Sequence, residues 1–351
     1  MTRAVRILWL GLFVACGLWA QKSKNKKPDE EPRPQVLEVL PEPPEAVAAD
    51  TARLSFQVSP LSDKGLLSQQ VRDALKSIAR LNHGGAIVKL RAFVAGSGDL
   101  RRVKDIVAEE LTARKQPLPA VSTIQVGALP LVGAQVVLEA ISSEKKIVNP
   151  NGLAFASASS APSPAAAVAQ LQDSLQRAGV NAAQVLRATC FLSSLDDLTS
   201  ARAALAAAFP SAAAQFVQSQ RLGLEAHAAC EAVARLDQQP ASAVVLASGM
   251  ASVNTPKLVL TGTQLIFGDQ DADFRLAYQR LGKAIGALGA TTQDVLWTGA
   301  YALTKPTAAK IESIEWEFLN RARAPATTAL QVEGLPSTDA TAAIEFIAVG
   351  H

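Results

Sequence analysis

The sequence contains few of the residues on which metal-dependent and nucleic-acid-binding proteins rely. Aromatic residues make up 5% of the 351 residues, histidine and cysteine occur three times each, and the formal net charge is only +3. No Lys/Arg run is interleaved with aromatics, which argues against a nucleic-acid surface. His227 and Cys230 are three residues apart on an expected strand and therefore point to opposite faces. With no other ligand spacing present, we expect no metal, no cofactor and no nucleic-acid partner.

Long apolar runs are also missing, except near the N-terminus. A basic stretch, MTRAVR, precedes a short apolar run that ends at Ala20. This order is typical of an export signal, and the run is short for a membrane span. We therefore expect residues 1–20 to be a signal peptide and the protein to be exported, to the periplasm or the extracellular space. Two alternatives are lipid attachment through Cys16 and an uncleaved N-terminal anchor.

Residues 21–50 are rich in lysine, then in acidic residues and proline. Such a composition cannot bury enough apolar surface to fold, so we expect a disordered tether. The tether would hold the folded part away from a membrane or a complex.

Two cysteines remain after the signal, Cys190 and Cys230, and both lie on expected strands. An exported protein can form a disulfide, but only if the two strands are neighbours. The interpretation that we favour is two buried thiols that act as small apolar side chains.

A segment of similar sequence occurs three times. It begins at Ile87 (IVKLRAFVAGSGDL), at Val185 (VLRATCFLSSLDDL) and at Val295 (VLWTGAYALTKP). Each copy lies between two amphipathic helix patterns, and each unit closes on a similar strand that ends near Ser142, Leu236 or Gly350. The repeat predicts three units, at residues 51–145, 146–240 and 241–351.

Each unit is predicted to run strand, helix, strand, helix and two further strands. In the second unit, Pro164 follows Ser163 at a helix start, and Val168, Leu171 and Leu175 form an apolar stripe. Two helices on one face of a mixed sheet give an α+β layer whose other face needs a partner. We expect the three units to supply that partner to one another, as a single-chain pseudo-trimer that is a monomer.

The segment Val185 to Leu198 resembles the central strand of the RidA/YjgF family, a small trimeric α+β fold of the chorismate-mutase-like type. Residues 325–348 resemble the last third of that family. The resemblance implies clefts between units and hydrolysis of enamines and imines formed from amino acids. It also implies an arginine, in a Pro-Ala-Arg-Ser motif, that binds the substrate carboxylate, and a glutamate on the final strand that helps to position water.

All three units depart from that pattern. The position of the family arginine is occupied by Val121, Ala214 and Thr327. The Glu-x-Glu of the final strand keeps only its second member, as Glu139, Glu231 and Glu345. Loss of the arginine removes about 1.5–3 kcal/mol of charge-assisted hydrogen bonding to a carboxylate substrate.

The surviving polar residues have two interpretations each. The three glutamates are either carboxylates in the clefts or charges at a sheet edge or unit interface paired with an arginine, and we favour the second. Ser157, Thr261 and Thr327 are candidate cleft residues by their place in the family pattern, although hydroxyls at strand ends usually bond to nearby backbone. We predict no catalytic residue.

The sequence thus predicts an exported, catalytically degenerate protein with a binding or scaffold role, whose partner is a small molecule or a protein. The alternative is an enamine/imine hydrolase with an altered substrate that uses one surviving cleft between units.

Overall fold

The computed structural model describes residues 40–96, 98–220, 227–247 and 249–351. Leu40–His351 forms one compact unit by its contacts. The predicted signal peptide, Cys16 and the first part of the predicted tether lie outside the described residues.

The first sheet has four strands in the order β2-β5-β3-β4. β3 and β4 are parallel and the other pairs are antiparallel, so the sheet is mixed. Two helices, α1 and α2, accompany it. The bounds are β2 Leu54–Val58, α1 Leu67–Leu81, β3 Ala86–Ala95, α2 Arg101–Ala113, β4 Ala120–Val126 and β5 Val136–Ser143.

The second sheet has the order β11-β12-β6-β10-β8-β9, and β7 also pairs with β10. β8 and β9 are its parallel pair. The bounds are β6 Leu153–Ala156, β7 Ser160–Ala161, α3 Pro164–Arg177, β8 Val185–Leu192, α4 Leu198–Ala208, β9 Ala213–Gln218, β10 Ala228–Arg235, β11 Val244–Ala247 and β12 Met250–Val253.

The third sheet has the order β1-β13-β17-β15-β16, and β14 also pairs with β17. Its parallel pair is β15 with β16. The bounds are β1 Ala46–Ala49, β13 Leu258–Thr261, β14 Gln264–Phe267, α5 Asp271–Gly286, β15 Val295–Ala302, α6 Lys305–Glu315, β16 Ala326–Gln331 and β17 Ala340–Val349. Short 3-10 turns lie at Thr51–Arg53, Ala182–Gln184, Leu195–Asp197, Thr292–Asp294 and Arg321–Arg323.

Local sequence explains where the helices begin. The Ser163 side chain accepts a hydrogen bond from the Ala166 amide and Pro164 occupies the first turn of α3. Thr304 caps α6 in the same way, by accepting from the Thr307 amide. In each unit an apolar cluster fills the space between the helices and the sheet.

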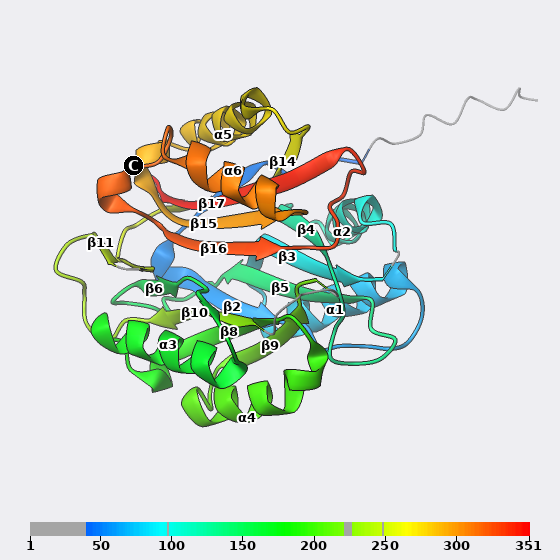
Figure 1. Ribbon diagram of the computed structural model, residues 1–351, viewed down its shortest axis with the longest axis horizontal. Coiled ribbons are helices and arrows are strands. Elements are labelled where there is room, and N and C mark those ends of the chain that lie inside the picture. The colour runs from blue at the N-terminus through cyan, green and yellow to red at the C-terminus, as the bar shows by residue number, and fades with distance from the viewer. Residues whose placement is uncertain (1–39, 97, 221–226, 248) are drawn as a thin grey trace, which may run out of the picture. The chain divides into compact units, whose positions relative to one another are not determined.

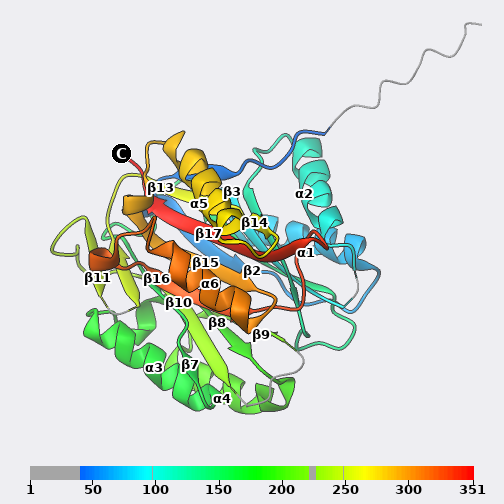
Figure 2. The same cartoon turned by 45° about the horizontal axis from the view of Figure 1, so that its top comes forward.

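The sheets of the three units face one another, and the helices lie on the outer faces (Figure 1). Figure 2 shows the same arrangement with α5 and α6 brought forward over β17 and β15. Two further apolar clusters contain residues from all three sheets, for example Phe56, Phe155 and Trp297 in one and Phe93, Phe191 and Tyr301 in the other. The prediction of an α+β pseudo-trimer, with two helices for each mixed sheet, is confirmed.

The structure differs from the predicted unit boundaries at two places. Ala46–Ala49, in the predicted tether, forms β1 and pairs with β13 of the third sheet. β11 and β12, in the predicted third unit, extend the second sheet by pairing with each other and with β6. In both cases a short apolar segment covers a sheet edge that would otherwise leave its backbone groups unpaired.

The cysteines are bonded, so the preference for two free thiols is wrong. Cys190 on β8 lies directly opposite Cys230 on β10, and the two form a disulfide. Directly opposed residues of an antiparallel pair have side chains on the same face, which brings the two sulfurs together.

Among the helices that the structure describes, none has the length and apolar character needed to cross a membrane.

Candidate functional site

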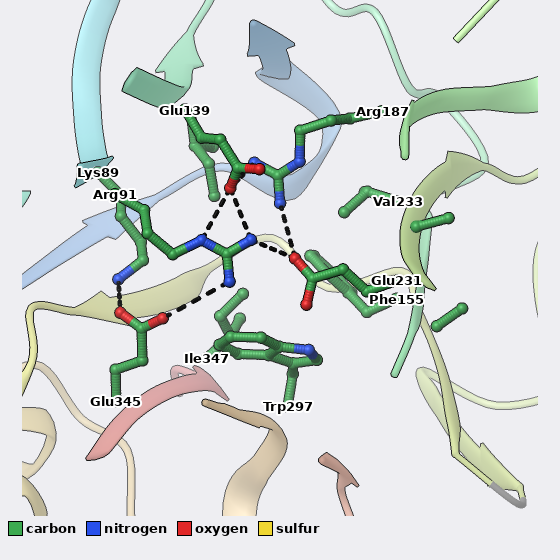
Figure 3. A pocket seen from close by; sticks show the side chains of 13 residues that line it. Lys89, Arg91, Glu139, Phe155, Arg187, Glu231, Val233, Trp297, Glu345 and Ile347 are labelled. Carbon is green, nitrogen blue, oxygen red and sulfur yellow. Dashed lines mark hydrogen bonds and ion pairs between the residues drawn. The ribbon is translucent and has the colours of Figure 1, made fainter. Parts of the chain in front are cut away.

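The three family-type glutamates meet where the three sheets face one another (Figure 3). In the strand registers, Glu139 on β5 lies opposite Arg91 on β3, and Glu231 on β10 lies opposite Thr189 on β8. Glu345 on β17 lies opposite Gly299 on β15. Because these three registers are equivalent, the pseudo-threefold arrangement brings all three carboxylates to the centre. All three glutamates are buried.

Arg91 is the hub of this central cluster. Its Nε donates to Glu139 Oε2 at 2.8 Å. One terminal nitrogen, Nη2, contacts Glu231, and the other, Nη1, lies 3.9 Å from Glu345 Oε1. One guanidinium from the first unit therefore contacts a carboxylate from each unit.

Two more cations complete the cluster. Lys89 Nζ lies 2.6 Å from Glu345 Oε2, and Arg187 lies 3.3 Å from Glu139 and 3.8 Å from Glu231. Three carboxylates and three cations thus balance in formal charge. Glu139 and Glu231 are thus paired with arginines where the units meet, whereas the nearest cation to Glu345 is Lys89.

Hydroxyl groups bind the same carboxylates across the unit boundaries. Thr189 of the second unit donates to Glu139, Thr328 of the third unit donates to Glu231 at 2.8 Å, and Ser122 of the first unit donates to Glu345. Each glutamate therefore accepts a hydrogen bond from the next unit, which links the three sheets in a closed cycle.

The electrostatics favour the ionised forms of Glu139 and Glu345. Burial alone would raise the pKa of Glu139, but the charges of Arg187 and Arg91 outweigh burial and hold its pKa below the usual glutamate value. Burial likewise opposes ionisation of Glu345, and Lys89 and Arg91 together hold its pKa down. The space inside the cluster is a cavity of about 20 Å³, enough for about one water molecule and no organic ligand.

Thr261 also serves the interior rather than a cleft. Its hydroxyl accepts a hydrogen bond from the Phe346 amide at 2.8 Å, and its carbonyl accepts from Lys89. It is fully buried.

An open cleft of about 930 Å³ lies at the boundary between the second and third units. We call it the α6 cleft, because α6 and β16 form one side and residues 157–160 with Gly249 form the other. It brings together two of the predicted candidates, Ser157 and Thr327. Its walls are largely apolar and include Ala300, Ala302, Ala308, Ile311, Trp316 and Leu330.

The two hydroxyls in the α6 cleft already have local partners. Ser157 Oγ donates to the Gly249 carbonyl at 2.9 Å, and Thr327 accepts from the Thr298 hydroxyl at 2.9 Å. Each keeps acceptor capacity for a bound molecule.

The three positions of the lost family arginine have different surroundings. Val121 is buried, and the backbone of Gly262 packs closely against it. A Cβ atom added to Gly262 would lie 2.6 Å from the Val121 carbonyl oxygen. Ala214 is exposed at the edge strand β9. Thr327 alone of the three lines the α6 cleft.

Sequence reasoning missed the charged residues of the α6 cleft. Lys305, Glu312 and Glu315 of α6 line it, and Glu315 is only 5% exposed. Burial raises the pKa of Glu315 to about 7, with a contribution from the neighbouring charge of Glu312. Glu315 lies one turn after Ile311, on the apolar stripe of α6, and a charge in such a stripe was the available signal.

Comparison with known proteins found no matching family model and no matching curated protein. The chain is similar to solved structures of the YjgF family. One, from Neisseria meningitidis, is 16% identical and covers 27% of this chain and 80% of its own, with a TM-score of 0.25. Another, from Mycobacterium tuberculosis, is 27% identical and covers 26% and 77%, with a TM-score of 0.24.

A similarity over more of the chain is to a chorismatase structure. It is 10% identical and covers 86% of this chain and 99% of its own, with a TM-score of 0.26. The resemblance to the RidA/YjgF family that the sequence predicts is thus also found among solved structures.

Proposed function

We propose that this protein binds a small molecule in the α6 cleft and does not carry out the enamine/imine hydrolysis of RidA-like proteins. The observation that carries the proposal is the separation of the two halves of the expected site. The glutamates lie in a buried, charge-balanced cluster, whereas the open space lies at Thr327.

The α6 cleft has the properties of a small-molecule site. Its volume of about 930 Å³ falls within the range of about 300–1,000 Å³ that is typical of ligand pockets. Apolar walls would bury the body of a ligand, and Ser157, Thr327 and Glu315 would fix its orientation.

The family reaction is disfavoured at this cleft by what stands at position 327. A threonine hydroxyl cannot form the bidentate charge-assisted pair that an arginine forms with a substrate carboxylate. Glu231 is linked to this part of the third unit through Thr328, the residue after Thr327. Its carboxylate accepts a hydrogen bond from the Thr328 hydroxyl and contacts Arg91, so it is not free to act on a substrate.

A hydrolase with an altered substrate is the second candidate, and Glu315 is the observation in its favour. A carboxyl group with a pKa of about 7 in a cleft is suited to proton transfer near neutral pH. Among the described residues that line the cleft, no hydroxyl is hydrogen-bonded to Glu315 or to another base that could activate it, so binding remains our conclusion.

We also propose that the protein is exported and acts as a monomer. The N-terminal pattern supports export, and the Cys190–Cys230 disulfide is in keeping with an oxidising compartment. Closure of the core by three units of one chain supports the monomer.

Filling the cleft tests the proposal. Thr327→Trp would occupy the space beside Ser157, so binding of benzyl alcohol, measured by saturation-transfer NMR on the full chain, should be lost. Thr338→Trp places the same side chain at an exposed site outside the cleft lining and should bind as the wild type does. Binding that survives Thr327→Trp would contradict the proposal, and so would a wild type that binds neither benzyl alcohol nor its charged analogues benzylamine and benzoate.

A further inference from the structure

We infer that the ligand of the α6 cleft is a small organic cation, an ammonium group on an apolar body, with Glu315 as its counter-ion. The inference rests on the proposed function, because it names the class of ligand for the same cleft.

Glu315 is a largely buried residue whose carboxyl group lacks a protein partner and keeps access to the open cleft. Only 5% of the residue is exposed, and it lines the cleft. Among the residues that the structure describes, its carboxyl group forms no hydrogen bond and no ion pair, in contrast to the three central glutamates. Partial burial without a partner disfavours the charged form of this carboxyl group, and a cation in the cleft would offset that penalty.

The surroundings of Glu315 favour positive charge in the ligand. Glu312, one turn earlier on α6, lines the same cleft. Glu315 is the last residue of α6, where the helix dipole places partial negative charge. Trp316 is also in the lining and offers an aromatic surface, one face of which is covered by the Arg321 guanidinium.

The basic groups nearby do not neutralise this end of the cleft. The Arg321 guanidinium lies 5.3 Å from the centre of the Trp316 ring and pairs with neither carboxyl group. Lys305 begins α6, ten residues before Glu315, and a rise of 1.5 Å per residue places the two Cα atoms about 15 Å apart. Lys305 is therefore at the opposite end of α6 from the two carboxyl groups.

An anionic ligand would be disfavoured at this end of the cleft by the carboxyl groups of Glu312 and Glu315. The position from which the family arginine would reach a carboxylate is Thr327, so an anion would find hydroxyls and two carboxyl groups there. Relative to the family pattern, the cleft has lost a cation and gained acidic groups, which reverses the charge that it should select.

The affinity for a cation should depend on pH. The titratable and charged groups around Glu315 are Glu312 and Lys305 on α6, Arg321 after it, and Tyr278 on α5. Burial first, and then Glu312, raise the pKa of Glu315 to about 7, while Arg321 acts in the opposite direction. Glu315 is therefore largely protonated below neutral pH, so affinity for a cation is full at higher pH and falls as the pH drops through 7.

Three probes of one shape and different charge test the inference: benzylamine, benzyl alcohol and benzoate. We expect calorimetric titration of the full chain at pH 8 to show benzylamine binding at least tenfold more tightly than the other two. Between pH 8 and pH 6 its affinity should fall about tenfold, as expected for one carboxyl group that must ionise with a pKa near 7.

Glu315→Gln should remove the preference for benzylamine and its pH dependence. The matched control is Glu317→Gln, an exposed residue that pairs with Arg275 on α5; it should behave as the wild type does. Glu312→Gln should give a smaller loss, because Glu312 is exposed to solvent.

The two proposals fail in different ways. If the three probes bind equally, or benzoate binds best, and Thr327→Trp still abolishes binding, the cleft is a binding site but the inference is wrong. If no probe binds the wild type, or Thr327→Trp leaves binding intact, the proposed function itself is wrong.

Discussion

Arg91 contacts carboxylates from all three units, although the equivalent positions of the other units hold Thr189 and Gly299. At the residue scale, the centre of the molecule is therefore asymmetric in sequence and balanced in charge. Gln215 shows the same asymmetry. It occupies the strand position that Ser122 and Thr328 hold in the other two units. Its buried amide has no hydrogen-bond partner among the described residues. The hydroxyl that donates to Glu139 comes instead from Thr189 on the neighbouring strand.

Replacement of Arg91 should strongly destabilise the fold. Arg91→Met would leave Glu139 and Glu231 buried with weakened pairing, so we expect a loss of about 3–5 kcal/mol in the free energy of unfolding. Arg275→Met is the control, because Arg275 pairs with Glu317 at the surface and should lose about 1 kcal/mol or less. Urea unfolding measures both, and equal losses would contradict a structural role for the central cluster.

Residue-level prediction from the sequence succeeded only where a pattern could guide it. The equivalence of Glu139, Glu231 and Glu345 follows from the repeat, but their partners Lys89 and Arg187 do not, because those contacts cross between units. Glu315 was missed because a single acidic residue near a helix end is usually solvated. Its burial depends on the packing of α6 against its neighbours.

At the element scale, the periodicity of the sequence was sufficient for the long helices and the central strands. β3, β8 and β15 form at the repeated segments, and α3 begins at the predicted Ser163-Pro164. The edge strands β1 and β11 were not predicted. A four-residue apolar segment can pair with any exposed edge, and tertiary arrangement decides which one is available.

The disulfide joins two central strands of the second sheet and should stabilise that unit. Cys190 and Cys230 are separated by 40 residues, and a loop of that length corresponds to roughly 3–4.5 kcal/mol in the chain-entropy estimate. Reduction with dithiothreitol should therefore lower the unfolding midpoint in urea. A Cys190→Ala, Cys230→Ala double variant should already have the lowered midpoint and should not respond to the reductant. A wild type that is insensitive to reduction would contradict a stabilising bond.

At the scale of the whole molecule, three units of one chain keep a common architecture and have diverged in their polar residues. The family-type glutamates now hold the three sheets together through Lys89, Arg91 and Arg187. The open α6 cleft lies at the boundary of the second and third units. We therefore assign the three central glutamates to structure and propose the α6 cleft as the binding site.

The most direct test is whether the retained carboxylates catalyse anything. The full chain should be incubated with an unstable imino acid, and ammonia release should be compared with that in buffer. Because each central carboxylate is paired and buried, we expect release at the buffer rate. Release well above that rate, and its loss in Glu231→Gln, would show that a central carboxylate acts on substrate and would contradict the account.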